Sequence, residues 1–229
     1  MWHGGWCWDE VAGILRARGH TVTTPTQTGL GERSHLIAKS ITLEIFIEDL
    51  VNHLKWETPG NAVLVPHSFG GVPVCGVADR VPELIERLIF LDAALLLDGE
   101  SWFGLLPSDM AEERVAKAHE SSGGISFPPP PPQAFGVIDP NQVAMMEAKL
   151  TPHPLATCVT PLLLTEELGN GLPGDFIACT EPVYPPAAAM QKRASNLGWP
   201  VSELATGHDA MLTAPLETAD LLEKLATGG

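Results

Sequence analysis

The sequence predicts an α/β protein with a mostly parallel sheet and helices on both faces. Short apolar runs rich in β-branched residues alternate with longer segments whose apolar residues recur at helical spacing, the pattern of a parallel sheet. The most informative stretch is 61–78, which reads NAVLVPHSFGGVPVCGVA. Its first residues form a continuous apolar run, as expected for a strand buried on both faces. A tight segment and then small and apolar residues follow, which predict a sharp turn into a helix.

The rest of the core follows the same rhythm. In the helix expected over Thr42–Trp56, the apolar side chains recur every three or four residues and form one face. Gly19 is a suitable stop for the first helix. The expected helices are Asp9–Gly19, Thr42–Trp56, Pro186–Leu197 and Leu216–Leu225, and the expected strands are Thr21–Thr24, Ala62–Val65, Arg87–Asp92, Asp175–Thr180 and Trp199–Leu204.

The alternation breaks in the middle of the chain. Helices are expected over Met110–Glu120 and Asn141–Leu150, with no strand pattern between them. The proline-rich run Phe127–Pro132 requires an extended, polyproline-like backbone. We interpret this run as a stiff loop, the alternative being a docking site for a proline-reading domain. The sequence therefore predicts a core of residues 1–97 and 174–229 with an inserted cap over 98–173.

Composition excludes several classes of function. The 229 residues are 45% hydrophobic, enough for one domain with a large core. A formal net charge of −15 argues against nucleic acid and anionic membranes as partners. The four cysteines are scattered without metal-ligand spacing, so we expect buried free thiols and no metal. No signal peptide or membrane-spanning run is evident, and we expect a cytoplasmic protein, with a homo-oligomer left open.

Ser68 stands at the apex of the turn between the predicted strand and helix. This arrangement is typical of a nucleophile elbow, which holds a serine clear of the sheet, within reach of a histidine base and of backbone N–H donors. Gly70, two residues later, is expected to let the helix pack close to the strand. The common pattern Gly-x-Ser-x-Gly has Pro66 in place of its first glycine here. His67, beside the serine, is expected to have a packing role.

His208 is the candidate base, because it lies in a loop after the last predicted strand and before the closing helix. An ordinary histidine pKa of about 6.5 suits proton transfer near neutrality. We expect Glu181, directly after the strand Asp175–Thr180, to be the acid that orients His208. Asp92, at the end of the strand after the elbow, is the alternative acid. Asp209 is expected to be structural.

Several motifs together carry a family resemblance. These are HGGWCW, TGLGERSHL, the Ser68 elbow, LDAALLLDGES, ACTEP and ATGHDAMLTAP. In this order they resemble bacterial α/β-hydrolases related to plant methyl-salicylate esterases and hydroxynitrile lyases. The resemblance implies an α/β-hydrolase fold in which Phe69 and Met1 supply the oxyanion-hole N–H groups. It also implies a strand before Trp2, which is absent from the chain, so we expect the Ala62–Val65 strand to be left with an open edge.

The elbow and the segment SFPPPPPQAFG resemble a branch of that family that cleaves methyl carbamates of benzimidazoles. The resemblance implies a small aromatic carbamate or ester as substrate, and no cofactor. Alternatives are a generic aryl or methyl carboxylesterase, a hydroxynitrile lyase and a non-catalytic ligand receptor. Aromatic residues are expected to wall a flat pocket or, alternatively, to pack the cap on the core: Trp2, Trp102, Phe103, Phe127 and Phe135.

Overall fold

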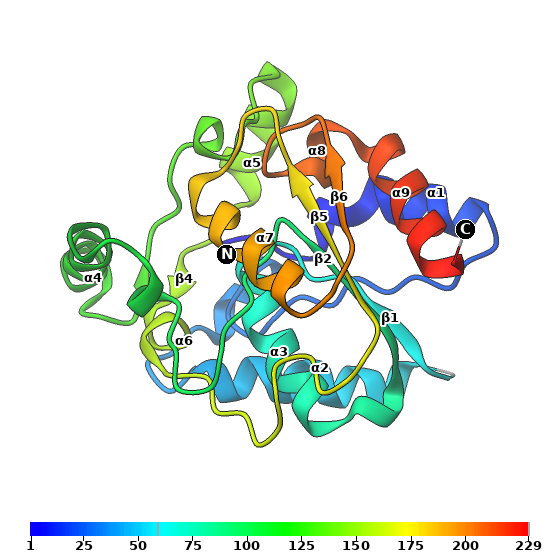
Figure 1. Ribbon diagram of the computed structural model, residues 1–229. Coiled ribbons are helices and arrows are strands. Elements are labelled where there is room, and N and C mark those ends of the chain that lie inside the picture. The colour runs from blue at the N-terminus through cyan, green and yellow to red at the C-terminus, as the bar shows by residue number, and fades with distance from the viewer. Residues whose placement is uncertain (59, 229) are drawn as a thin grey trace.

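The computed structural model describes residues 1–58 and 60–228, and a parallel sheet lies at its centre (Figure 1). Four strands pair in the order β1-β2-β5-β6, and every pair is parallel. Parallel pairing places the carboxyl ends of all four strands at one edge of the sheet. The strands are β1 (Ala62–Leu64), β2 (Ile85–Leu91), β5 (Gly174–Cys179) and β6 (Val201–Leu204).

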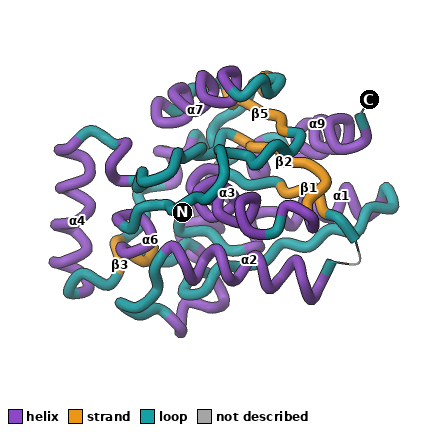
Figure 2. The backbone as a smooth tube through the Cα atoms, turned by 60° about the horizontal axis from the view of Figure 1, so that its bottom comes forward, coloured by secondary structure: helices purple, strands orange, loops and turns teal. Residues whose placement is uncertain are grey.

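Helices cover both faces of this sheet, as Figures 1 and 2 show. On one side, α1 (Asp9–Ala17) packs against α9 (Pro215–Thr227); on the other, α2 (Leu43–Glu57) packs against α3 (Gly71–Arg80). A further helix, α7 (Pro185–Asn196), packs on β5 and β6. Within the described residues, no helix combines the length and apolar character needed to cross a bilayer. The predicted α/β architecture is therefore confirmed.

The helix α2 illustrates how the sequence pattern becomes packing. Its buried side chains, which follow helical spacing, form the face turned to α3: Leu43, Phe46, Ile47, Val51 and Leu54. The two helices approach closely at Gly76, where an added Cβ would lie 2.5 Å from Ile47 Cδ1. A side chain at that position would push the helices apart and loosen the core.

Residues 98–173, coloured from green to yellow in Figure 1, supply the group of elements between β2 and β5. Their last part packs along α3, where the Thr165 N–H donates to Asp79 and the Asn170 side chain donates to the Ala78 carbonyl. The polyproline expectation is met only in part, because Phe127 pairs in a short strand and Pro132 begins a 3₁₀ turn. The group contains α4 (Ser108–Ser122), α5 (Pro140–Lys149), α6 (Leu155–Val159) and the antiparallel pair β3 (Ser126–Phe127) and β4 (His153–Pro154).

One predicted strand is wrong. Thr21–Thr24 has no strand structure, because it pairs with none of the described strands. A cavity of about 680 Å³ is lined by this segment and by β1, so the two backbones do not meet. Among the described residues, β1 is consequently an edge strand that pairs only with β2. The apolar residues Ala62–Leu64 are partly exposed there.

The four cysteines are buried free thiols, as the sequence predicted. Burial raises the pKa of Cys75 and of Cys158 to about 12, so neither thiol ionises near neutral pH. The pKa of Cys7 and of Cys179 is also raised, mainly by burial. Buried, protonated thiols are poor nucleophiles and poor metal ligands.

Candidate active site

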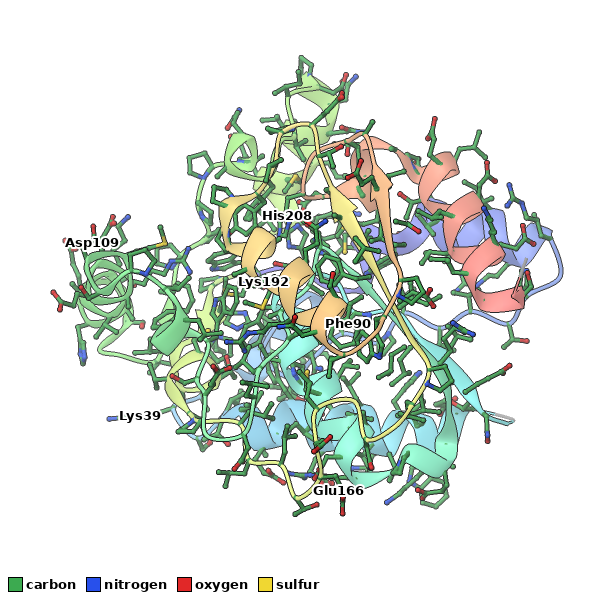
Figure 3. The ribbon with its side chains drawn as sticks, viewed as in Figure 1. Lys39, Phe90, Asp109, Glu166, Lys192 and His208 are labelled. Carbon is green, nitrogen blue, oxygen red and sulfur yellow. The ribbon has the colours of Figure 1, made fainter. Side chains whose placement is uncertain are left out.

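Three polar side chains meet at the carboxyl edge of the sheet. Ser68 follows β1, Asp92 follows β2 and His208 follows β6, so each is carried past the end of a different parallel strand. In Figure 3, His208 is labelled near the upper ends of β5 and β6, whereas Lys39, Asp109 and Glu166 lie at the rim of the molecule. The convergence of these loops is a consequence of the sheet topology.

Ser68 has the strained backbone that a nucleophile elbow requires. Its φ is +55°, in the left-handed region that residues other than glycine rarely adopt. The Ala94 N–H donates to the Ser68 carbonyl at 2.8 Å and holds the turn in place. The glycine that permits close packing is Gly71, not Gly70. A Cβ added at Gly71 would lie 2.0 Å from the Ala94 oxygen, whereas one at Gly70 meets nothing closer than Pro66 at 3.9 Å.

The serine, the histidine and one carboxylate form a continuous hydrogen-bonded chain. His208 Nε2 lies 2.8 Å from Ser68 Oγ, and His208 Nδ1 lies 2.5 Å from Asp92 Oδ2. Because the carboxylate only accepts, Nδ1 carries the proton and Nε2 is left to accept from the serine hydroxyl. His208 and Asp92 are almost fully buried, whereas Ser68 is partly exposed to solvent. The arrangement can deprotonate the hydroxyl of an accessible serine.

The carboxylate beside His208 differs from the one expected from the sequence. The side chain of Glu181 is exposed, and its backbone N–H donates to the Thr206 carbonyl. Asp92 instead has a φ of +45°, which turns its side chain under the imidazole at the end of β2. Its Oδ1 also accepts from the Cys179 N–H at 3.3 Å. The backbone of β5 therefore helps to fix the Asp92 carboxylate beside His208.

Two N–H groups near Ser68 were expected to form an oxyanion hole. Phe69 lies in the 3₁₀ turn Ser68–Gly70 that leads into α3, so its N–H is among those that a helix start leaves without an intrahelical acceptor. Met1 begins a tight turn, in which the His3 N–H donates to the Met1 carbonyl at 2.8 Å. The Trp2 N–H is already used, because it donates to His153 Nδ1 at 3.3 Å.

The five aromatic residues expected near the pocket lie together and are all buried. Trp2 is central, with its ring 5.5 Å from that of Phe127 and 5.8 Å from that of Phe135, measured between centroids. Phe103 continues the cluster 5.5 Å beyond Phe127, and Trp102 packs edge-on against Phe69. This aromatic cluster therefore connects Phe69, the residue after Ser68, with the segment 98–173.

Two residues at the site were not predicted. Tyr184, the single tyrosine of the chain, stacks on His208 with 4.0 Å between centroids and 28° between planes. Tyr184 follows the predicted strand Asp175–Thr180, and this place at the carboxyl edge of the sheet could have identified it as a residue near His208. Arg114, on α4, lies over the rings of Trp2 and Phe103 at 5.9 and 5.8 Å. Arg114 could not be recognised from the sequence, because it resembles the other charged residues of the predicted helix Met110–Glu120.

Behind His208, a second group of buried polar residues surrounds Asp209. Burial alone would raise the pKa of Asp209, but the charge and hydrogen bond of His3, followed by His67 and His208, hold it at about 2. His67 donates through Nε2 to the His208 carbonyl at 2.8 Å. Burial, and then the charge of His208, places the pKa of His67 well below its ordinary value. His67 is therefore neutral and Asp209 is ionised.

Among the described residues, His67, His208 and Asp209 place potential metal-binding atoms within 4.8 Å of one another. Both ring nitrogens of His208 are already occupied by Ser68 and Asp92. His67 Nε2 is likewise occupied by a carbonyl. Because these atoms have protein partners, we assign no metal to the group.

Comparison with known proteins gives consistent results. The family model described as "Alpha/beta hydrolase family" matches residues 1–221. A carbendazim hydrolyzing esterase from Nocardioides sp. (strain SG-4G) is 34% identical, over 98% of this chain and 96% of that protein. Methylesterase 10 of Arabidopsis thaliana is 27% identical, over 98% and 88%. An extracellular alpha/beta-hydrolase from a Paenibacillus species superposes with a TM-score of 0.84 at 26% identity, covering 97% of this chain and 94% of that one.

Proposed function

Because this chain belongs to the alpha/beta hydrolase family and is an ester-bond hydrolase like its esterase relatives, we propose that it cleaves the methyl carbamate of a benzimidazole. The substrate is carbendazim, and the products are 2-aminobenzimidazole, methanol and carbon dioxide. The observation that carries the proposal is the Ser68–His208–Asp92 hydrogen-bonded chain. The 34% identity to an esterase named for carbendazim directs it to this substrate.

The first step forms a covalent carbamoyl-enzyme. His208 Nε2 takes the proton of Ser68 Oγ as that oxygen bonds to the carbamate carbonyl carbon. Asp92 stabilises the resulting imidazolium through Nδ1 and keeps the ring in the required orientation. The bond to the methoxy oxygen then breaks, and His208 returns the proton to the departing methanol.

Backbone donors stabilise the negative charge that develops on the carbonyl oxygen. The Phe69 N–H is at the start of a helix, where the peptide dipoles also favour an anion. The backbone nitrogen of Met1 is the proposed second donor. Donors of this kind contribute about 3 kcal/mol each to stabilisation of the transition state.

The second step releases the enzyme. Water loses a proton to His208 and attacks the carbamoyl carbon, and Ser68 leaves with that proton. The freed carbamic acid loses carbon dioxide and becomes the 2-amino heterocycle. Each proton moves between substrate, water and His208, so the proposed chemistry requires no metal or organic cofactor.

The aromatic cluster is the proposed binding site for the flat ring system. Trp2 packs edge-on against Phe127 and tilted against Phe135, and all three rings are buried, so binding of a planar heterocycle would require these rings to move apart. Phe135 also lies 6.3 Å from His208 with nearly parallel planes. We treat residues 98–173 as a cap, because they supply Trp102, Phe103, Phe127 and Phe135 to the cluster.

A methyl ester of an aromatic carboxylic acid is the second candidate substrate. It is favoured by the 27% identity to a methylesterase over 98% of this chain. The same triad would cleave it through an acyl-enzyme with loss of methanol. The two candidates differ in the second product, which is an amine for the carbamate and a carboxylic acid for the ester.

Mass-spectrometric product analysis tests the proposal. The purified chain is incubated with carbendazim, a matched methyl benzoate and a phenyl acetate, with Ser68→Ala as the blank. Formation of 2-aminobenzimidazole at a higher kcat/KM than any ester product supports the carbamate assignment. Faster cleavage of the methyl benzoate would assign the enzyme to the carboxylesterases instead. Absence of all products, with Ser68 unreactive to a fluorophosphonate, would overturn the serine hydrolase mechanism.

A further inference from the structure

His3 makes two hydrogen bonds whose acceptors lie in distant parts of the chain. Its Nδ1 lies 2.7 Å from the Met1 carbonyl, and its Nε2 lies 3.1 Å from Asp209 Oδ2. Asp209 is the residue after the proposed base, and its side chain is completely buried. His3 therefore joins the N-terminal turn to the loop that carries His208.

The two acceptors determine the protonation state of the ring. A carbonyl oxygen can only accept a hydrogen bond, and so can an ionised carboxylate. An aspartate with an ordinary pKa of about 3.9 is ionised at neutral pH, and Asp209 has an imidazole nitrogen facing each of its two oxygens. Both nitrogens of His3 must therefore donate, which requires a proton on each and makes the ring an imidazolium. His67, the other imidazole facing Asp209, is 3.8 Å from Oδ1 and donates to the His208 carbonyl, so it does not replace His3.

The turn that His3 closes is strained. Trp2 has a φ of +63°, a conformation that a bulky side chain rarely adopts. The Met1 carbonyl accepts from both the backbone N–H and the ring Nδ1–H of His3, so the same residue holds this turn twice. Trp2 also donates through its ring Nε1 to the Phe127 carbonyl at 3.3 Å. Strained residues persist only where their surroundings fix them, as these contacts do.

We infer that His3, protonated on both ring nitrogens and paired with Asp209, is a positioning residue that holds the strained Met1–Trp2 turn against the His208 loop. The inference rests on the proposed function, in which that turn supplies an oxyanion donor and an aromatic wall. Both parts must keep a fixed distance from Ser68 as charge develops. The ring of His3 is itself packed between Trp6 and Phe135, with centroids at 5.5 and 5.7 Å, so it has little freedom to move.

The protonation state can be measured without any substrate. Uniform ¹⁵N-histidine labelling and two-bond ¹H–¹⁵N spectra at pH 7.0 distinguish an imidazolium from a neutral ring. The His3 signals are identified by their loss in His3→Gln. We expect protons on both nitrogens in the wild type, and a single ring proton in Asp209→Asn, where the negative charge is gone. A neutral His3 in the wild type would overturn the inference.

Kinetics test the positioning role. His3→Gln and Asp209→Asn should each lower kcat by about ten-fold to a hundred-fold, because a displaced donor loses alignment with the reacting atom. KM should change much less, by about three-fold or under. The kcat of the double variant should lie within about two-fold of the kcat of the slower single variant, because both substitutions break the same contact between His3 and Asp209. His20→Gln is the matched control: His20 Nε2 pairs with Glu223 Oε1 at 2.8 Å, remote from the site. It should keep wild-type kcat.

Fluorophosphonate labelling of Ser68 separates this inference from the proposed function. Labelling needs the triad and the oxyanion hole but not the natural substrate. Slower labelling in His3→Gln than in His20→Gln supports the positioning role even if carbendazim is not cleaved. Equal labelling and equal kcat, with unchanged circular dichroism, would show that His3 only packs. If His3→Gln does not fold, Asp209→Asn and the wild-type spectra decide between the same outcomes.

Discussion

His208 Nδ1 lies 2.5 Å from Asp92 Oδ2, which joins the loop after β6 to the end of β2. These residues are 116 positions apart in the chain and both are nearly fully buried. The bond holds the imidazole with Nε2 toward Ser68. In the proposed mechanism, Asp92 also supplies a negative charge that balances the imidazolium formed during proton transfer.

Asp92→Asn should therefore reduce kcat by roughly a thousand-fold to ten-thousand-fold, because an amide cannot hold the same tautomer or balance the charge. Glu181→Gln is the matched control, since that side chain is exposed, and it should stay within about two-fold of wild type. Steady-state kinetics with the best substrate of the panel gives both numbers. A larger loss of kcat in Glu181→Gln than in Asp92→Asn would identify Glu181, in the loop after β5, as the acid.

Ser68→Ala and His208→Ala should each abolish turnover while leaving the circular dichroism spectrum unchanged. The double variant should be about as slow as either single one, because the members of a triad act as a unit. Single-turnover assays with quenched product analysis give the residual rates. Activity of more than a few per cent in a folded Ser68→Ala would mean that another nucleophile attacks the substrate.

The sequence was sufficient to predict most elements, because apolar periodicity reports which faces are buried. It predicted that Ser68 and His208 follow strands, as they do in the structure, but it favoured Glu181 where the structure has Asp92 beside His208. Both Glu181 and Asp92 follow a predicted strand, so position along the chain did not separate them. The difference lies in the backbone: Asp92 has a positive φ that directs its carboxylate under His208, and no sequence pattern reports that angle.

The strand expected over Thr21–Thr24 failed for a related reason. Its β-branched residues have strand propensity, but a strand also needs a hydrogen-bonded neighbour. In the described structure, a cavity separates this segment from β1.

The contact between His3 and Asp209 also depends on the packing of segments at opposite ends of the chain. Such contacts follow from the assembled fold and cannot be derived from local pattern.

Gly71→Ala should destabilise the protein strongly, by about 3 kcal/mol or more. The new methyl group would collide with the Ala94 oxygen, and the elbow backbone would have to shift. Gly70→Ala is the control: it has a helical φ of −55° and an open environment, so a change of under about 1 kcal/mol is expected. Urea unfolding followed by circular dichroism measures both. Equal losses would show that the elbow tolerates movement of Ala94.

The free energy of unfolding should fall as the pH drops below about 6.5. Burial places the pKa of both His67 and His153 well below their ordinary value of 6.5, so both rings are neutral in the folded protein. The unfolded chain binds a proton on each ring as the pH falls through 6.5, and it is stabilised by doing so. Below pH 6.5, the free energy of unfolding therefore falls by about 1.4 kcal/mol per pH unit for each of the two groups. Above that pH, these two residues do not change the free energy of unfolding.

Urea unfolding at pH 7.5, 6.5 and 5.5 tests this dependence in the wild type and in His153→Gln. The variant lacks one of the two titrating rings. Between pH 6.5 and 5.5, the slope of its free energy of unfolding against pH should therefore be smaller than that of the wild type by about 1.4 kcal/mol per pH unit, which corresponds to one proton. His35→Gln, at an exposed position, should keep the wild-type slope. Parallel curves for all three proteins would mean that His153 takes up its proton without unfolding. Its bonds to the Trp2 N–H and Thr157 argue against that, because Nδ1 is needed as an acceptor.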